Sequence, residues 1–152
     1  MIRTPKPQDA RALWEIFTVS LGYACTQEVV HRRIVALAGS EHCISLVWQD
    51  DQTGQVGGFI HALRYDTLHN EGGWDVVSLA VAPELQGRGI GKQLLAAVEE
   101  RVRADSGTFV RLNSRVERTD AHGFYEHLGY TCDKLQKRFI KRLGDIGGGD
   151  TA

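Results

Sequence analysis

The chain has 152 residues, of which 42% are hydrophobic and 24% charged, and its 18 basic and 19 acidic side chains give a net charge of −1. This length and composition are typical of one globular domain that buries a sizeable core without disulfides or a structural metal. The balanced charge excludes a strong overall attraction to nucleic acid or to an anionic membrane surface.

Two helices are predicted in the first forty residues. Apolar residues recur at helical spacing after Asp9, which favours an amphipathic helix. They are Leu13, Trp14, Phe17 and Leu21. A second helical pattern runs from about Gln27 to Ala38, and Gly39 is the residue expected to end it.

Three strands follow these helices. Residues 44–49 and 56–63 are strand-like, and the polar segment 50–54 between them ends in glycine, which indicates a β-hairpin. Residues 65–73 form a polar loop. The nearly continuous apolar run 74–81 is typical of a strand covered on both faces.

The second half of the chain predicts a helix over 89–102, a strand over 109–113 and a short helix over 120–128 that Gly129 closes. A last strand is expected over 136–143. One face of the long helix is apolar. It carries Ile90, Leu94, Leu95, Val98 and Val102.

With a further strand expected before the first helix, this order of elements indicates an α/β protein with a sheet of mixed direction, formed by a single domain over residues 1–143. Residues 144–152 contain four glycines and two aspartates, so we expect a flexible tail there. The three cysteines share no C-x-x-C spacing, and the first residues lack the apolar stretch of a signal peptide. We therefore expect a cytoplasmic protein with no metal site.

The turn between the 74–81 strand and the following helix is glycine-rich and carries two cations, Arg88 and Lys92. Glycines keep side chains away from the backbone, and the start of a helix presents unpaired N–H groups at its positive end. A diphosphate suits this environment. The turn reads Gln86-Gly87-Arg88-Gly89-Ile90-Gly91-Lys92.

Two common nucleotide-binding loops do not fit this turn. A Walker A loop requires a glycine at the position of Gln86 and a serine or threonine at the position of Gln93. A dinucleotide-binding loop requires a third glycine where Lys92 stands.

Two segments resemble the GNAT superfamily of N-acetyltransferases. The first is Gln86-x-x-Gly89-x-Gly91 after a strand that ends in Val81-Ala82-Pro83. The second is Ala121-His122-Gly123-Phe124-Tyr125, followed by Gly129-Tyr130. The resemblance implies a mixed, mostly antiparallel sheet of six to seven strands with about four helices, splayed between strands 4 and 5. It also implies acetyl-coenzyme A (acetyl-CoA) as cosubstrate.

The resemblance assigns roles to particular residues. Tyr125 would lie near the sulfur of coenzyme A and protonate the leaving thiolate, a reasonable task for a phenol of pKa about 10. The fourth strand would bind the pantetheine arm, and the turn would bind the diphosphate. The residues implied in cofactor binding are Leu79, Ala80, Val81, Gln86, Gly87, Arg88, Gly89, Ile90, Gly91, Lys92 and Tyr125.

The acceptor amine must lose a proton before it attacks, so a base is required. In many family members this is a carboxylate eleven positions before the glutamine of the turn, which in this chain is Asp75. Asp75 is expected to act as the base, directly or through a water, or to bind the amine. Glu71 in the preceding loop is the competing carboxylate on the substrate side.

One departure from the family pattern bears on the substrate. Arg118 stands where many relatives carry asparagine, and the stretch from Arg118 to Tyr125 looks like that of the aminoalkylphosphonate N-acetyltransferases. An arginine can grip a phosphonate or carboxylate with two hydrogen bonds. A surface role for Arg118, or a contact with the phosphates of coenzyme A, stays open beside a role in substrate binding.

The sequence thus predicts an acetyl-CoA-dependent N-acetyltransferase. It would acetylate a primary amine of a small molecule by direct attack in a ternary complex, with a homodimer as the expected assembly. Two alternatives remain: a non-catalytic module that binds or senses acyl-coenzyme A, and an acetyltransferase that acts on protein amino groups.

Overall fold

The computed structural model describes residues 1–144, which contain five strands and four α-helices. They divide into two compact units, Met1–Leu112 and the segment that begins at Asn113. The order of elements agrees with the sequence prediction as far as the last helix. The predicted tail, 144–152, lies outside the described residues except for its first glycine.

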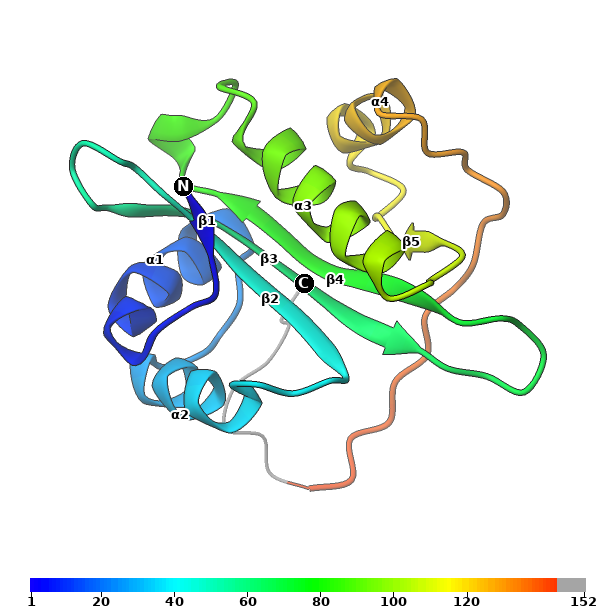
Figure 1. Cartoon of the computed structure of the whole chain (residues 1–152), viewed down its shortest axis with the longest axis horizontal. Helices are drawn as coiled ribbons and strands as arrows, with labels where there is room; N and C mark the ends of the chain where they lie inside the picture. Colours follow the sequence, from blue (N-terminus) through cyan, green and yellow to red (C-terminus); the bar gives the residue numbers. More distant parts are fainter. Residues whose placement is uncertain (145–152) are drawn as a thin grey trace. The chain divides into compact units, whose positions relative to one another are not determined.

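The first unit is built on one five-stranded sheet with the strands in chain order (Figure 1). Its strands are β1 (Ile2–Arg3), β2 (Cys43–Gln49), β3 (Val56–Tyr65), β4 (Gly73–Val81) and β5 (Val110–Leu112). Neighbours pair antiparallel except β4 and β5, which run parallel. The mixed direction was predicted, but the expected six to seven strands were too many.

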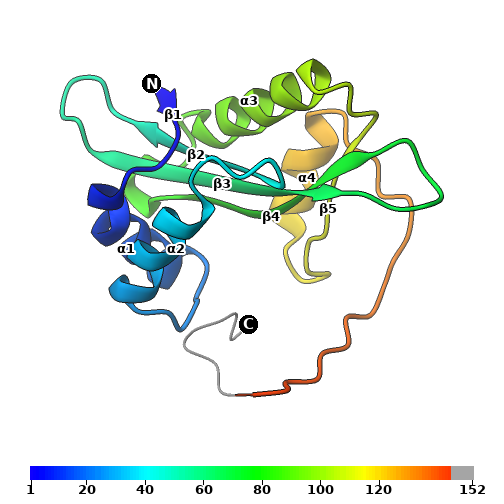
Figure 2. The same ribbon diagram turned by 60° about the horizontal axis from the view of Figure 1, so that its bottom comes forward.

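Three helices cover the two faces of this sheet. Figure 2 shows α1 (Ala10–Ser20) and α2 (Gln27–Leu37) on one face and α3 (Ile90–Ala104) on the other. Short 3-10 turns, η1 (Pro7–Asp9) and η2 (Pro83–Leu85), precede α1 and α3. All five apolar residues predicted to face inward from α3 are at most 3% exposed, so the helical spacing gave the correct face.

Strand β4 differs from its prediction in one respect. The register between β3 and β4 shifts at His61/Ala62, so that Ser78 pairs with His61 and Val76 with Ala62. Val77 is the extra residue of this bulge and is 44% exposed. The continuous apolar run had indicated a strand covered on both faces. That prediction is wrong at Val77, because a bulge interrupts the regular alternation of side chains there and leaves this one exposed.

The second unit contains one helix, α4 (Thr119–His127). Gly129 closes it as predicted, with φ of +93° and a hydrogen bond from the Tyr130 N–H to the Tyr125 carbonyl at 3.0 Å. The strand predicted over 136–143 is absent, because these residues pair with no strand within the described part of the chain. Phe139 is 89% exposed, so the apolar content that suggested a strand is not buried here.

Candidate active site

Strand β4 is paired along the whole of one edge and along only part of the other. Its register with β3 runs from Gly73 to Val81. Its pairing with β5 covers only Trp74, Asp75 and Val76. Strand β5 ends at Leu112, the partner of Val76, so the second half of β4 keeps an edge with no strand beside it among residues 1–144.

The direction of the backbone groups on this edge follows from one hydrogen bond. The Ala82 N–H donates to the Gly57 carbonyl of β3 at 2.8 Å. Successive residues of a strand present their backbone groups to opposite edges, so Ala80 also faces β3. The N–H groups of Leu79 and Val81 point the other way, toward the edge of β4 that has no neighbouring strand.

The end of β4 leads directly into the glycine-rich turn. Gly87 and Gly89 have φ of +78° and +77°, in the left-handed region that disfavours other residues, and a Cβ at either position would meet no atom within 4 Å. Gly89 is the N-cap of α3 and supplies no side-chain cap. The first hydrogen bond back into the turn runs from Gln93 to the Gly89 carbonyl at 3.0 Å.

The N–H groups of residues 90–92 at the start of α3 therefore have no helical acceptor, and they lie at its positive end. Arg88 and Lys92 are exposed beside them. A backbone surface that combines free donors, empty space and mobile positive charge suits a diphosphate. These features fit the ligand that the sequence predicts for the turn.

The start of α3 is held in place by close packing on β3. Ile90 is 2% exposed and Leu94 fully buried. A Cβ on Gly58 would come within 3.0 Å of Ile90 Cγ2 and 3.1 Å of Leu94 Cδ1, so the absence of a side chain at Gly58 allows this approach. The Ile90 side chain thus belongs to the core, and only its amide is available to a ligand.

A clamp that the sequence did not reveal fixes the junction of strand and turn. The Val81 carbonyl accepts hydrogen bonds from Ser20 Oγ at 3.0 Å and from Gln86 Nε2 at 3.2 Å. Gln86 therefore turns its amide back onto β4, and Ser20 ties the end of α1 to the same point. No local pattern could have signalled Ser20, because its partner is 61 residues away in the chain.

Asp75 lies on β4 where β4 still pairs with β5, and it forms an ion pair. Arg111 donates from Nε to Asp75 Oδ1 at 3.3 Å and from Nη2 to Oδ2 at 3.5 Å. The Arg111 guanidinium also stacks over the Tyr65 ring at 3.8 Å from its centroid. Both Asp75 oxygens are thus engaged by one cation that the sequence had not identified.

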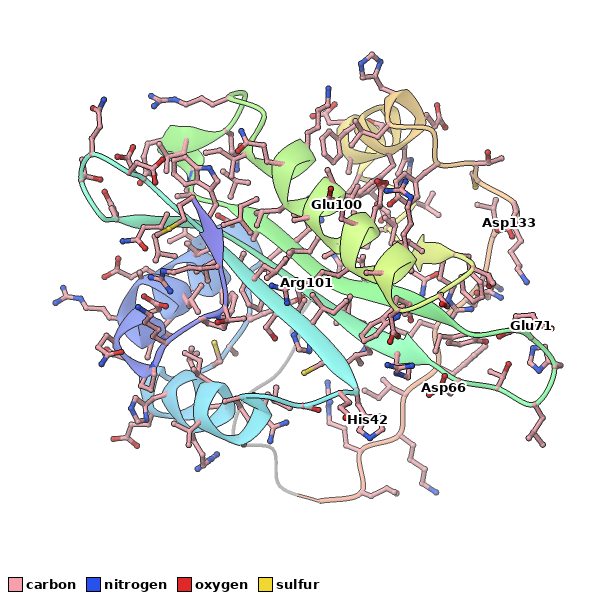
Figure 3. All side chains as sticks on the ribbon, viewed as in Figure 1. His42, Asp66, Glu71, Glu100, Arg101 and Asp133 are labelled. Atoms are coloured by element: carbon pink, nitrogen blue, oxygen red, sulfur yellow. The ribbon has the colours of Figure 1, made fainter. Side chains whose placement is uncertain are left out.

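Glu71, the competing carboxylate, lies in the loop between β3 and β4 and is exposed (Figure 3). Glu71 lies before the start of β4, whereas the glycine-rich turn lies after its end. With about 3.3 Å per residue, the nine residues of β4 separate the two ends by roughly 25 Å. Asp75 is the nearer of the two carboxylates to the open part of the strand.

In the second unit, α4 carries the other two predicted site residues. The Tyr125 ring packs against Phe124 and Tyr130, with centroids 5.2 and 6.1 Å apart. Burial raises the pKa of the Tyr125 phenol, and the nearby charge of Arg118 offsets part of this increase. The phenol therefore keeps its proton at neutral pH. Arg118 is exposed and stands at the N-cap of α4.

Within residues 1–144, no group of three or more His, Cys, Asp or Glu side chains is arranged to hold a metal ion. Nor is any helix there both long and apolar enough to cross a membrane.

Residues 10–130 match the Acetyltransferase (GNAT) family. Because this match covers most of the chain, the protein belongs to that family. A relative in Salmonella typhimurium, aminoalkylphosphonate N-acetyltransferase, is 36% identical over 94 residues, which are 60% of this chain and 59% of that protein. The match thus spans little more than half of the relative's length.

Solved structures with the same fold include two aminoglycoside 6'-N-acetyltransferases. AAC(6')-Iy in complex with CoA has a TM-score of 0.80 and 18% identity, covering 94% of this chain and 95% of that chain. AAC(6')-Ih from Acinetobacter baumannii has a TM-score of 0.78 and 17% identity, covering 95% and 99%. At these identities the similarity establishes the fold.

The geometry of the turn predicts that acetyl-CoA raises the melting temperature and that Gly89→Val removes most of this increase. A ligand at a hundred times its Kd adds about 2.7 kcal/mol to the free energy of unfolding. A valine would strain the left-handed backbone and place methyl groups in front of the free amides. Thermal unfolding with and without saturating acetyl-CoA measures both effects.

Gly39→Val is the matched control, because Gly39 has φ of +72° and equally empty surroundings at the far end of α2. It should lower the melting temperature but retain the increase on adding acetyl-CoA. An unmodified protein that acetyl-CoA does not stabilise, or a Gly89→Val protein that it stabilises fully, would contradict this assignment of the turn.

Proposed function

We propose that the protein is an acetyl-CoA-dependent N-acetyltransferase that acetylates a primary amine of a small molecule by direct attack in a ternary complex. The observation that carries the proposal is the unpaired edge of β4, which leads through the glycine-rich turn to the free amides at the start of α3. The family supports the chemistry, and the names of the relatives, which include aminoalkylphosphonate and aminoglycoside acetyltransferases, support a small amine as acceptor.

The cosubstrate would bind along this continuous backbone surface. Its diphosphate would accept hydrogen bonds from the amides of residues 87–92, with Arg88 and Lys92 adding charge. Its pantetheine arm would hydrogen bond to Leu79 and Val81 as an added strand does. Ala80 would contribute through van der Waals contact, because its backbone groups face β3. An amide of this edge could also polarise the thioester carbonyl.

Tyr125 is the proposed proton donor. When the tetrahedral intermediate collapses, the C–S bond breaks and its electron pair stays on sulfur, which must then gain a proton. Because burial raises the pKa of the phenol, Tyr125 is protonated at neutral pH and can donate its proton to sulfur as the C–S bond breaks.

Asp75 is the proposed binding group for the incoming ammonium, with Glu71 as the competitor. The Asp75 carboxylate already accepts two hydrogen bonds from Arg111, and its remaining lone pairs can hold the amine. Arg118 is the proposed contact for an anionic group on the acceptor. Its guanidinium is exposed and makes no ion pair within residues 1–144.

The proposal competes with a module that only binds acyl-coenzyme A and with an enzyme that acetylates protein amino groups. Release of free thiol from acetyl-CoA, measured with aminoethylphosphonate, butylamine and a lysine-containing peptide, separates the three. Thiol release with a small amine and none with the peptide supports the proposal. No release with any acceptor would contradict it. The cytoplasmic location and the homodimer stay predictions from the sequence.

Tyr125→Phe should lower kcat by about a hundredfold to ten-thousandfold, the usual contribution of general acid catalysis, with little change in the affinity for acetyl-CoA. The substitution removes only the hydroxyl and keeps the aromatic packing. Single-turnover kinetics report the chemical step, and Tyr130→Phe serves as a control in the same aromatic cluster. Wild-type turnover by Tyr125→Phe would remove this residue from the mechanism.

Arg118→Lys should weaken aminoethylphosphonate much more than butylamine, because lysine keeps the charge but cannot make the two-pronged contact. The comparison is the ratio of kcat/KM values for the two amines in each protein. Arg103→Lys, on the exposed face of α3, is the control. Equal losses for both amines would assign Arg118 to coenzyme A binding or to packing instead.

A further inference from the structure

A row of polar side chains crosses the sheet beside the core on the face covered by α1 and α2. Val47, Phe59 and Ala80 are register neighbours on three strands, and all three belong to the apolar cluster that includes α1 and α2 residues. Side chains two positions apart in a strand share a face. The next row on that face is Ser45, His61 and Ser78.

The His61 imidazole is oriented by a short hydrogen bond. Its Nδ1 lies 2.6 Å from Ser45 Oγ on β2, and its ring stacks on Phe59 with an interplanar angle of 10°. The two ring nitrogens face different ways, so Nε2 is directed away from Ser45. Within residues 1–144 no hydrogen-bond partner of Nε2 is found, and the ring is half-buried.

This row ends at the site. Ser78 is the register partner of His61, and its Cβ is about 5 Å from that of a directly opposed residue. Ser78 also lies beyond Val76, where pairing with β5 has ended, and it directly precedes Leu79, whose N–H faces the open edge. His61 is therefore one strand away from the point where the proposed acyl group would lie.

The surroundings of His61 keep the imidazole neutral. Burial lowers its pKa below the usual value of 6.5, and the positive charge of Arg33 on α2 lowers it further. On the same face, β2 carries the Ser45 hydroxyl beside His61 and the Cys43 thiol two residues earlier. The residues of α1 that pack on this face are apolar. The carboxylate of Asp75 on β4 is paired with Arg111. A neutral imidazole near pH 7 can accept a proton.

We propose that His61 is the general base of this acetyltransferase, that Ser45 positions it, and that the proton of the acceptor ammonium reaches Nε2 directly or through Ser78. The inference deepens the proposed function and rests on it. It assigns to a third-strand histidine the task for which the sequence had suggested Asp75, whose two oxygens are both engaged by Arg111.

The ammonium gives one proton to His61 Nε2, and the freed lone pair of nitrogen forms the C–N bond to the thioester carbonyl carbon as the C=O π pair moves onto oxygen. That pair then re-forms the C=O bond, and the C–S bond breaks with its electron pair on sulfur, which takes a proton from Tyr125. The amide nitrogen loses its second proton to restore the phenol, and the imidazolium releases its proton to solvent.

The test is the pH dependence of kcat/KM with aminoethylphosphonate in His61→Asn and His61→Gln. Asparagine and glutamine place a neutral amide near the former Nδ1 and Nε2, respectively, so each variant can preserve one hydrogen bond of the ring. Near pH 7 both should lose about a hundredfold to ten-thousandfold in kcat/KM. Their activity should recover toward pH 10, where the amine loses its proton unaided. Near pH 7, Ser45→Ala should lose less kcat/KM than either His61 variant.

His42→Gln is the matched control, because His42 is exposed just before β2 (Figure 3) and should keep both the rate and the profile of the parent protein. The stabilisation by acetyl-CoA shows that each variant is folded. A second readout uses the unaltered protein, since the His61 imidazole ¹⁵N resonances, assigned by their absence in His61→Gln, should shift when aminoethylphosphonate is added with coenzyme A.

Each outcome decides between the two proposals. If the unaltered protein releases thiol but His61→Asn and His61→Gln keep its rate and pH profile, the histidine assignment is overturned and the enzyme assignment stands. The histidine assignment is also overturned if the His61 ¹⁵N resonances do not shift when the amine is added. If the unaltered protein releases no thiol with any amine, the proposed function itself fails, and the role of His61 fails with it.

Discussion

The site depends on the unequal pairing of β4. One edge of this strand is hydrogen bonded to β3 over its full length, whereas the other loses its partner after Val76. Backbone N–H and C=O groups are obligatory hydrogen-bonding groups, so an edge that the sheet leaves open requires water or a ligand. The unpaired half of this edge is thus a cost to the sheet unless other groups hydrogen bond to it, and it is where we propose that the cosubstrate binds.

The rest of the first unit keeps this surface continuous. Gly58 lets Ile90 and Leu94 approach β3, which places the start of α3 directly after the end of β4. Ser20 and Gln86 hold the Val81 carbonyl at the junction. The unpaired edge of β4, the turn and the start of α3 thus follow one another along the chain, with the Ser20 and Gln86 side chains bound to the edge at Val81. The bulge at Val77 also matters, because it sets which residues of β4 face the open edge.

The sequence predicts those parts of the molecule whose signals are local. The buried face of α3 follows from helical spacing, and the end of α4 at Gly129 follows from the backbone freedom of glycine. Contacts between residues that are distant in the chain could not be predicted in this way, because strand register determines which residues meet. The pairs Arg111–Asp75 and Ser45–His61 are examples. The strand expected over 136–143 failed for a related reason. Alternation and apolar content indicate that a segment can pair, but not that a partner edge is present.

The central claim is that coenzyme A binds along the open edge of β4 and the start of α3. A titration of ¹⁵N-labelled protein with acetyl-CoA, followed through the backbone amide resonances, tests it most directly. Saturable shifts are expected, and they should be largest for Leu79, Val81 and residues 87–92. Only a small change is expected for Ala80, whose backbone groups face β3. Shifts of equal size at Ala80, or shifts that leave the turn unaffected, would contradict this binding mode.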